Sequence, residues 1–415
     1  MKEIIKDQLV WWRFKKEISS CNIVINMYKT SEKNKIQNSV CVLPAAGPGS
    51  LGDEAMLRGM KGFFDKQGVK IYPIGLFEDQ HWPFLSETIG IVPNEINDWR
   101  AFLLKLFRFD VLYINGADMM DAGYGIKAVE KRLILAYIAS ELGMKVVITG
   151  FSFSDKAPKV LAKLYSVLGN NVKFCVRDPF SAKRFSDLTG KRAEQVADLA
   201  FMMQAKRSNF KNENVFDWCE RSRKANKNIV GINICAHTIS EDRKSITPDS
   251  IELFLSIYEE GLVKFLSENE STSLVFIPHD LRGLFNDLNL SLILKARLVN
   301  KFGAERVDVL ELECSADEIK AMVSKLDYVF SGRMHLAIAA IGATTPVACV
   351  TYQGKFEGLY DFVGLKKSLL IQNNKFNAES LYKVIYDLKE NRNVYKDVLL
   401  GSYDKLQSYS NLNLR

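Results

Sequence analysis

The sequence predicts two α/β domains, each a doubly wound parallel sheet, that face each other across a cleft. Short β-branched runs alternate with amphipathic stretches, and this alternation predicts parallel strands with helices on both faces of the sheet. The runs form two series, and a polar stretch separates the two. The first series is SVCVLPA, VKIYPIG, DVLYING, KVVITG and VKFCVRD, and the second is NIVGINICA, SLVFIPHD, RVDVLEL, LDYVFSG and PVACVTY.

The chain is long enough for two hydrophobic cores, because 47% of its 415 residues are apolar. No internal repeat or low-complexity segment interrupts the two series. The expected segments are a basic amphipathic extension at 1–39, an N-terminal domain at 40–205, a linker at 206–228, a C-terminal domain at 229–390 and a C-terminal tail or helix at 391–415.

The charge of the chain argues against a nucleic-acid partner. There are 56 basic and 49 acidic residues, a net charge of +7, and the surplus lies at the two ends. Residues 1–39 hold eight Lys and Arg against four acidic residues. Neither end has the dense basic and aromatic patches of a nucleic-acid-binding protein, so we expect no nucleic acid among the partners.

The cysteines and the start of the chain indicate a cytoplasmic protein. Seven cysteines are scattered without a C-x-x-C pair, several of them inside apolar strand-like runs, as expected of buried thiols in a reducing compartment. The N-terminal sequence MKEIIKDQLVWWRFKKEI lacks the apolar core of a signal peptide. No stretch elsewhere reaches about 18 apolar residues without polar breaks, so we expect no membrane-spanning helix.

The N-terminal segment has the pattern of a basic amphipathic helix. The apolar residues Ile5, Leu9 and Trp12 fall at i, i+4 and i+7. The basic residues beside them are Lys2, Lys6 and Arg13. Such a helix makes peripheral contact with a membrane, here the inner face of the plasma membrane, or packs on the protein body. The sequence leaves both interpretations open.

The stretch LPAAGPGSLGDEAMLRGM, residues 43–60, resembles a phosphate loop between a strand and a helix. The spacing from Gly47 to Gly52 copies G-x-x-x-x-G, but Asp53 and Glu54 stand where a nucleotide loop has Lys and Ser or Thr. A carboxylate about 4 Å from a phosphate costs on the order of 4 kcal/mol at an effective dielectric near 20. This loop is therefore no nucleotide site, and other residues must decide what Asp53 does.

One interpretation of Asp53 is structural. Its carboxylate is a candidate N-cap, accepting from the free N–H groups of the helix that follows. The apolar stripe of that helix would consist of Met56, Met60 and Phe63.

Polar residues follow most of the expected strands, at the edge where a parallel sheet binds ligands. Three of the four histidines are among them, with two arginines and a lysine, and this combination favours a cleft that holds an anion and moves protons. The residues are Asp53, Asn115, Gly116, Asp121, Arg177, Asp178, Asp198, His237, His279, Asp280, Arg333, His335 and Lys355.

The stretch SGRMHLAIAAIGATTPVACV predicts a turn, a small-residue helix and a strand. Gly332 permits the tight turn, and the N-terminus of the helix attracts an anion. Arg333 and His335 project at this point. In the alternative interpretation, Arg333 pairs with a neighbouring acid and His335 caps the turn.

The motifs together resemble the polysaccharide pyruvyl transferase family. SGRMHLAIAAIGATTPVACVTYQGKFEG is similar to its C-terminal signature, with S-x-R-x-H, G-x-x-x-P and Y-x-x-K elements, and GSLGDEAML is similar to its N-x-G-D-E loop. CVRDPFS and VADLAF resemble its V-R-D-x-x-S and V-x-D-x-x-F elements. The resemblance runs from about residue 41 to about residue 364. Ser50 replaces the usual Asn, and NGAD at 115–118 replaces a glycine triplet.

The resemblance implies a glycosyltransferase B-like fold and a pyruvyltransferase that uses phosphoenolpyruvate. The enolpyruvyl group would form a cyclic ketal on a sugar of a cell-surface polysaccharide precursor, for exopolysaccharide or capsule biosynthesis. The donor would bind in the C-terminal half, and an oligosaccharide or lipid-linked glycan acceptor would approach from the N-terminal half. No cofactor is implied, and no residue spacing calls for a metal.

The resemblance also implies roles for the candidate residues. His335, Asp53 and Arg333 would be catalytic, with His335 as the acid or a phosphate ligand and Asp53 as the base. Arginine forks suit the planar carboxylate of the donor, and a lysine suits its phosphate. The implied substrate-binding residues are Arg177, Arg333, His335, Lys355, His279, Gly52, Asn115 and Asp121.

Two other functions stay open on the sequence. A nucleotide-sugar-dependent glycosyltransferase of the same architecture would use an acidic residue for the ribose, and Glu357 is present. A non-catalytic sugar-binding relative would keep the fold without turnover.

Overall fold

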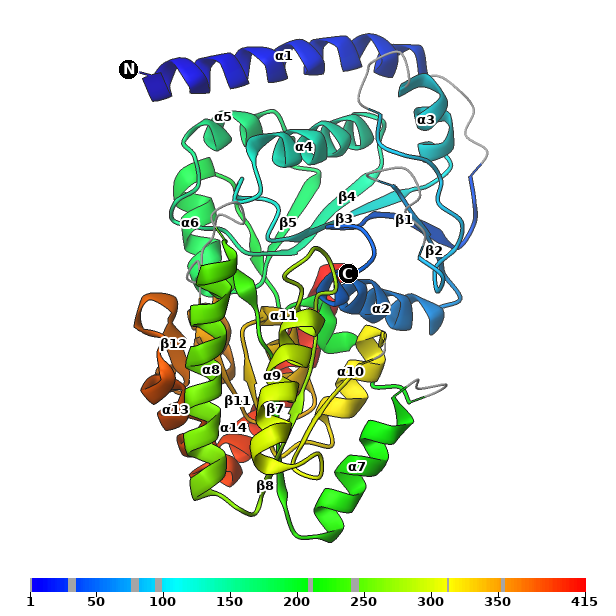
Figure 1. Cartoon of the computed structure of the whole chain (residues 1–415). Coiled ribbons are helices and arrows are strands. Elements are labelled where there is room, and N and C mark those ends of the chain that lie inside the picture. The colour runs from blue at the N-terminus through cyan, green and yellow to red at the C-terminus, as the bar shows by residue number, and fades with distance from the viewer. Residues whose placement is uncertain are drawn as a thin grey trace. The chain divides into compact units, whose positions relative to one another are not determined.

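The computed structural model describes residues 2–28, 35–75, 82–93, 99–207, 212–239, 246–311, 313–351 and 355–415. The chain divides into two compact units (Figure 1). Unit 1 comprises residues 1–48, 56–202 and 407–415, and unit 2 comprises residues 49–55 and 203–406. Helices α2 (Leu51–Asp65) and α14 (Arg392–Asn411) each begin in unit 2 and end in unit 1.

Unit 1 is built on a parallel sheet with the strand order β2-β1-β3-β4-β5-β6. Its strands are β1 (Ser39–Leu43), β2 (Lys70–Pro73), β3 (Val111–Ala117), β4 (Lys145–Phe151), β5 (Val172–Val176) and β6 (Glu194–Gln195). Its helices besides α2 are α1 (Lys2–Tyr28), α3 (Trp99–Leu106), α4 (Ile126–Glu141), α5 (Val160–Ser166) and α6 (Pro179–Thr189).

The central strands of unit 1 are buried on both faces, as continuous β-branched runs predict. On one face, residues such as Leu112 and Val146 join a core with α1, α4 and α5, and Figure 1 shows α1 lying over α4 and α5. On the other face, Phe64 of α2 packs against Tyr113 of β3, with ring centroids 5.6 Å apart. Helices therefore cover both faces of the sheet.

Unit 2 has a parallel sheet with the order β12-β11-β10-β7-β8-β9. Its strands are β7 (Asn228–Ile232), β8 (Thr272–Phe276), β9 (Val307–Val309), β10 (Tyr328–Ser331), β11 (Val347–Thr351) and β12 (Leu370–Gln372). Its helices besides α14 are α7 (Glu213–Lys224), α8 (Pro248–Glu268), α9 (Asp287–Phe302), α10 (Ala316–Val323), α11 (Met334–Gly342), α12 (Phe356–Val363) and α13 (Ala378–Glu390).

The strand order of unit 2 reverses direction between β7 and β10. These two strands are neighbours in the sheet although about 100 residues separate them in sequence. In doubly wound sheets the loops beyond the carboxyl ends of such a strand pair form the ligand crevice. The loops after β7, β8 and β10 are therefore where a site of unit 2 belongs.

The fold class predicted from the sequence is confirmed. All ten predicted runs form strands, and among the strands of the described residues only the short edge strands β6 and β12 were not anticipated. The interpretation of Asp53 as a helix N-cap is wrong, because α2 begins at Leu51 and Asp53 lies inside its first turn. The described part of the expected linker at 206–228 contains α7, and the expected domain boundaries stay a prediction.

Two further expectations concern thiols and membranes. All seven cysteines are free and buried, which confirms the prediction of buried thiols. Among the helices of the described ranges, none is both long enough and apolar enough to span a bilayer.

The last residues of the chain complete unit 1. Asn413 is fully buried; its Oδ1 accepts from the N–H of Gly150 at 2.8 Å, and its Nδ2 donates to the carbonyl of Ala197 at 2.8 Å. Both partners are backbone groups of the sheet region. A buried backbone group that loses its partner costs about 1–3 kcal/mol. The C-terminus is therefore a structural part of this unit.

We predict that Asn413→Ala lowers the free energy of unfolding by about 2–4 kcal/mol, because it leaves two buried backbone groups unsatisfied. Asn411→Ala is the matched control two residues earlier, where the side chain is half-buried, and should change stability by less than about 0.5 kcal/mol. Urea unfolding followed by circular dichroism measures both. Equal stability of the two variants would contradict a structural role for Asn413.

Candidate functional site

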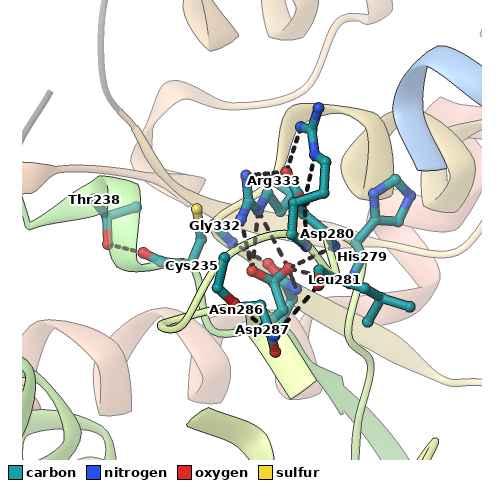
Figure 2. Close-up of polar contacts among 12 residues, drawn as sticks. Cys235, Thr238, His279, Asp280, Leu281, Asn286, Asp287, Gly332 and Arg333 are labelled. Atoms are coloured by element: carbon teal, nitrogen blue, oxygen red, sulfur yellow. Dashed lines mark hydrogen bonds and ion pairs between the residues drawn. The ribbon is translucent and has the colours of Figure 1, made fainter. Parts of the chain in front are cut away.

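A buried ion pair between Arg333 and Asp287 lies beyond the carboxyl ends of the central strands of unit 2 (Figure 2). Nη2 of Arg333 donates to Oδ1 of Asp287 at 2.7 Å, and Nε lies 3.2 Å from each carboxylate oxygen. Although burial opposes it, the carboxylates of Asp287 and Asp280 raise the pKa of Arg333 well above its usual value. Arg333 thus pairs with acids, as one of the two sequence interpretations expected.

Asp287 also fixes the loops that follow the neighbouring strands. Its Oδ2 accepts from Asn233 Nδ2 at 2.9 Å, from the N–H of His279 at 3.1 Å and from the N–H of Asp280 at 3.2 Å. Asn233 follows β7 and also accepts from the N–H of Gly332, after β10, at 3.3 Å. One carboxylate, itself at the start of α9, therefore holds together the ends of β7, β8 and β10.

The turn that carries Arg333 is built by its two preceding residues. Oγ of Ser331 accepts from the N–H of Arg333 at 3.0 Å. A Cβ at Gly332 would lie 2.6 Å from Cβ of Cys235, so only glycine fits against the end of β7. The need for Gly332 thus comes from close packing and not from a left-handed backbone.

Asp280 is a second ionised carboxylate in the cluster. Arg282 donates to it from Nε at 2.9 Å and from Nη2 at 2.7 Å, and Nη1 of Arg333 lies 3.3 Å from it. Burial acts in the opposite direction, but the hydrogen bonds from Arg282 and the charge of Arg333 lower the pKa of Asp280 to about 2. Asp280 therefore stays charged, and the cluster pairs two guanidinium groups with two carboxyl groups.

His279 is a neutral histidine at the side of this cluster. It follows β8, the sheet neighbour of β7, and its side chain is buried. Burial, together with the nearby His335 and Arg333, lowers the pKa of His279 to about 3. An imidazole with such a pKa carries no proton to donate as an acid near neutral pH.

The glycine loop before α2 joins this site, because residues 49–55 belong to unit 2. Ser50 forms an antiparallel β-bridge with Asp280. Gly49 has a φ of 95°, in the left-handed region that favours glycine. The contacts of this loop are thus with the loop that follows β8.

Gly52 and His335 are in direct contact. A Cβ at Gly52 would lie 2.2 Å from Nδ1 of His335, so the imidazole rests on the backbone of the first turn of α2. His335 itself lies in the first turn of α11. Two helix N-termini, each of which favours negative charge, therefore flank the same imidazole.

The two acidic residues of the loop differ in what they do. Oε1 of Glu54 accepts from the N–H of Ala316 at 3.2 Å, which caps the start of α10. Asp53 is buried and close enough to Arg282 for its charge to contribute to the raised pKa of that guanidinium. Asp53 thus lies near the ion-pair cluster of unit 2, while Glu54 is structural.

Arg177 lies in unit 1 after β5 and is almost fully buried. Its Nε donates to Ser152 Oγ at 2.7 Å, its Nη1 donates to Asp198 at 2.8 Å, and its Nη2 contacts Asp118. Burial opposes the shift, but the charges of Asp118 and Asp198 raise the pKa of Arg177. Each guanidinium nitrogen therefore has a partner within unit 1.

Asn115 and Asp121 also lie in unit 1. Oδ1 of Asn115 accepts from Thr149 Oγ1 at 2.8 Å, within the buried sheet. Asp121 accepts from the N–H of Gly123 at 2.9 Å and from the N–H of Ser154 at 3.1 Å, so it braces two loops. These contacts are typical of structural residues. A substrate-binding role for Asn115 or Asp121 stays a prediction.

The remaining candidates belong to unit 2. Lys355 is buried at the start of α12, and His237 is half-buried in the short turn after β7. Tyr352 of the Y-x-x-K element lies outside the described residues. Within the described ranges, no group of three or more His, Cys, Asp or Glu side chains could hold a metal ion.

Sequence reasoning missed three residues of the cluster: Asn233, Arg282 and Asp287. Asn233 directly follows a predicted strand, so its position was a usable signal. Arg282 lies in a loop and Asp287 at a helix start, and no spacing in the sequence connects either residue with Arg333.

Comparison with solved structures shows the fold. A putative UDP-N-acetylglucosamine 2-epimerase from Listeria monocytogenes matches with a TM-score of 0.59 and 11% identity, over 91% of this chain and 95% of that one. A glycosyltransferase from Rickettsia africae matches with a TM-score of 0.55 and 12% identity, over 92% and 99%. The fold is therefore glycosyltransferase B-like, as the sequence resemblance implied.

Comparison of the sequence gives a family. The family model described as polysaccharide pyruvyl transferase matches residues 51–354, most of the chain. No curated protein matches the chain in sequence. The matched range includes Gly52, Arg177, Arg333 and His335.

We predict that Gly52→Ala destabilises the protein by about 1–3 kcal/mol, because the added methyl group would force the His335 ring away from α2. The matched control is Gly62→Ala in the same helix, where a Cβ meets nothing within 4 Å. That variant should be more stable than the parent by roughly 0.5–1 kcal/mol, as expected for Gly to Ala inside a helix. Denaturant unfolding of both variants is the measurement, and a Gly52→Ala protein as stable as the parent would refute the contact.

Proposed function

The chain belongs to the polysaccharide pyruvyl transferase family, and on this premise we propose that it transfers the enolpyruvyl group of phosphoenolpyruvate to a sugar of a polysaccharide precursor. The product would be a cyclic pyruvate ketal on that sugar. The observation that carries the proposal is the packing of the His335 imidazole on the Gly52 backbone in unit 2. That contact joins the glycine loop and the S-x-R-x-H turn in one place.

The donor is an anion, and several features near His335 suit an anion. His335 lies in the first turn of α11, which carries no acidic residue, and free N–H groups at a helix N-terminus favour phosphate or carboxylate. The ion-pair cluster is balanced in charge, so the cluster itself neither attracts nor repels the donor strongly. Lys355, at the start of α12 in the same unit, is our candidate for an additional phosphate ligand.

The proposed reaction consists of one addition and one substitution, and the proton of the second hydroxyl leaves with the phosphate. A proton is added to the methylene carbon of phosphoenolpyruvate, which leaves an electron-deficient carbon that bears the phosphate. A first sugar hydroxyl attacks this carbon and loses its proton to a base. A second hydroxyl of the same sugar then displaces inorganic phosphate and closes the ketal. The balance is therefore one phosphoenolpyruvate and two hydroxyls to one ketal and one phosphate, without an oxidant or reductant.

Of the two site histidines, we assign the proton transfer to His335. The low pKa of His279 leaves that imidazole neutral and unsuited to act as an acid near pH 7. We assign the base to Asp53, a buried carboxylate on the same loop as Gly52. General acid and base steps of this kind contribute about 10²- to 10⁴-fold each.

Arg333 acts in this proposal chiefly as a positioning residue. Its three nitrogens all donate to Asp287 or Asp280. Each η nitrogen of an arginine carries two N–H groups, so a second N–H on Nη1 or Nη2 is our candidate to bind the donor carboxylate. Arg177 of unit 1 is a further candidate for binding the donor. Its hydrogen bonds to Ser152 and Asp198 hold its guanidinium in one orientation.

The acceptor in this proposal is an oligosaccharide or a lipid-linked glycan, made for exopolysaccharide or capsule in the cytoplasm. These points extend the family assignment to a substrate and a compartment. The loop at 115–118, where NGAD replaces the glycine triplet of the family, is a candidate determinant of acceptor choice.

We predict that His335→Asn lowers kcat by roughly 10²- to 10⁴-fold while phosphoenolpyruvate affinity changes little, since asparagine keeps a hydrogen bond but cannot transfer a proton. His237→Asn, at the other half-buried strand-end histidine, is the control and should retain activity. The measurements are phosphate release from phosphoenolpyruvate over a panel of oligosaccharide acceptors and donor binding by calorimetry.

Two results would contradict the proposal. Full activity of His335→Asn would remove that residue from the chemistry. Release of nucleoside diphosphate from a nucleotide sugar, with no phosphate released from phosphoenolpyruvate, would instead favour a glycosyltransferase.

A further inference from the structure

Helix α1 has two apolar faces, and only one of them is used inside the protein. The buried face packs on α4 and α5, as Figure 1 shows. Its buried residues are Val10, Phe14, Ile18, Cys21 and Ile25. The buried face confirms one of the two interpretations of the sequence, namely that the helix packs on the protein body.

The opposite face of α1 is also apolar, and it is exposed. Its large apolar side chains are Ile5, Leu9, Trp12 and Ile23, with exposed fractions of 51%, 62%, 65% and 63%. At about 100° per residue these four positions fall within an arc of roughly 60°, on the side of the helix opposite Phe14. Ile5, Leu9 and Trp12 are neighbours on this face, and Ile23 lies about three turns further along, beyond Lys16 and Ser19. An exposed apolar stripe of this kind, unlike isolated surface leucines, marks an interaction surface.

Most of the charged residues around the stripe are basic, and Glu17 is the acidic residue on the flank of Lys6. Lys16 lies within the stripe, and its Nζ is 5.8 Å from the ring centroid of Trp12. Lys6 and Arg13 lie on one flank of the stripe and Lys15 on the other, by their helical positions. Arg13 is paired with Glu130 of α4, so Lys6, Lys15 and Lys16 carry most of the outward positive charge.

A hollow beside the stripe continues the basic surface onto α4. Its volume is about 700 Å³, and Trp12 and Lys16 of α1 line it together with Lys127 and Lys131 of α4. Four basic and two acidic side chains line the hollow in total. Basic side chains of both α1 and α4 therefore lie near the exposed Trp12.

We propose that this face of α1 docks on the surface of an anionic lipid bilayer. The stripe of Ile5, Leu9, Trp12 and Ile23 would enter the interfacial region, where tryptophan is favoured. The lysines of α1 and α4 would meet lipid phosphates, and each such contact strengthens membrane binding. If a second copy of this chain bound here through the same stripe, the basic flanks of the two copies would face each other. Repulsion between these like charges disfavours that pairing.

The proposal does not depend on the enzymatic assignment, because the readout is binding. The parent chain should sediment with vesicles that contain about one third phosphatidylglycerol or phosphatidylserine, less at high salt, and should stay in solution with pure phosphatidylcholine vesicles. Leu9→Gln/Trp12→Gln should reduce the bound fraction by roughly ten-fold or more. Leu253→Gln/Leu284→Gln removes two equally exposed leucines of unit 2, with exposed fractions of 66% and 76%, and should bind as the parent does.

Circular dichroism and analytical ultracentrifugation of each variant complete the test. A folded Leu9→Gln/Trp12→Gln variant that sediments like the parent would overturn the proposal. So would failure of the parent chain to bind anionic vesicles. A parent dimer that the α1 variant converts to monomer, without vesicle binding, would assign the stripe to a second copy of the chain and would equally overturn it.

Discussion

The buried carboxylate of Asp287 is the interaction on which the site of unit 2 depends. A fully buried negative charge is tolerated only with strong partners, and Asp287 has a guanidinium, an amide and two backbone N–H groups. These donors come from the loops after three different strands. Removing one partner of such a pair typically costs about 3–5 kcal/mol, so the loops keep their positions together.

This arrangement separates the environments of the two site histidines. His279 is enclosed beside the positive charge of Arg333, and its proton affinity falls. His335 is half-buried, in the first turn of α11, and rests on the backbone of α2 where no side chain intervenes. The glycine at position 52 is thus as much a part of the site as the histidine, because any larger residue would displace the imidazole. His279 is thus suited to a fixed neutral role.

The sequence predicted the architecture well because hydrophobic runs of about five residues are a local signal. The edge strands β6 and β12 have only two and three residues, which is too short for this signal. The residues at strand ends were found by the same logic, including Arg333 and His335. What could not be predicted is the set of partners: Asp287 is 46 residues from Arg333, and only the folded chain brings them together. Likewise, the sequence of the glycine loop gave no sign that its contacts are with unit 2.

Burial of the His279 side chain, together with the nearby His335 and Arg333, keeps that imidazole neutral. The most direct measurement is histidine-selective NMR of the folded protein between about pH 8 and about pH 4.5, with the His279 signal assigned through His279→Asn. The account predicts no protonation of His279 in this window, since its pKa is lowered to about 3. The unfolded chain takes up that proton near pH 6.5, so stability should also fall as the pH drops below this value. A His279 titration with a midpoint near 6.5 would contradict the account.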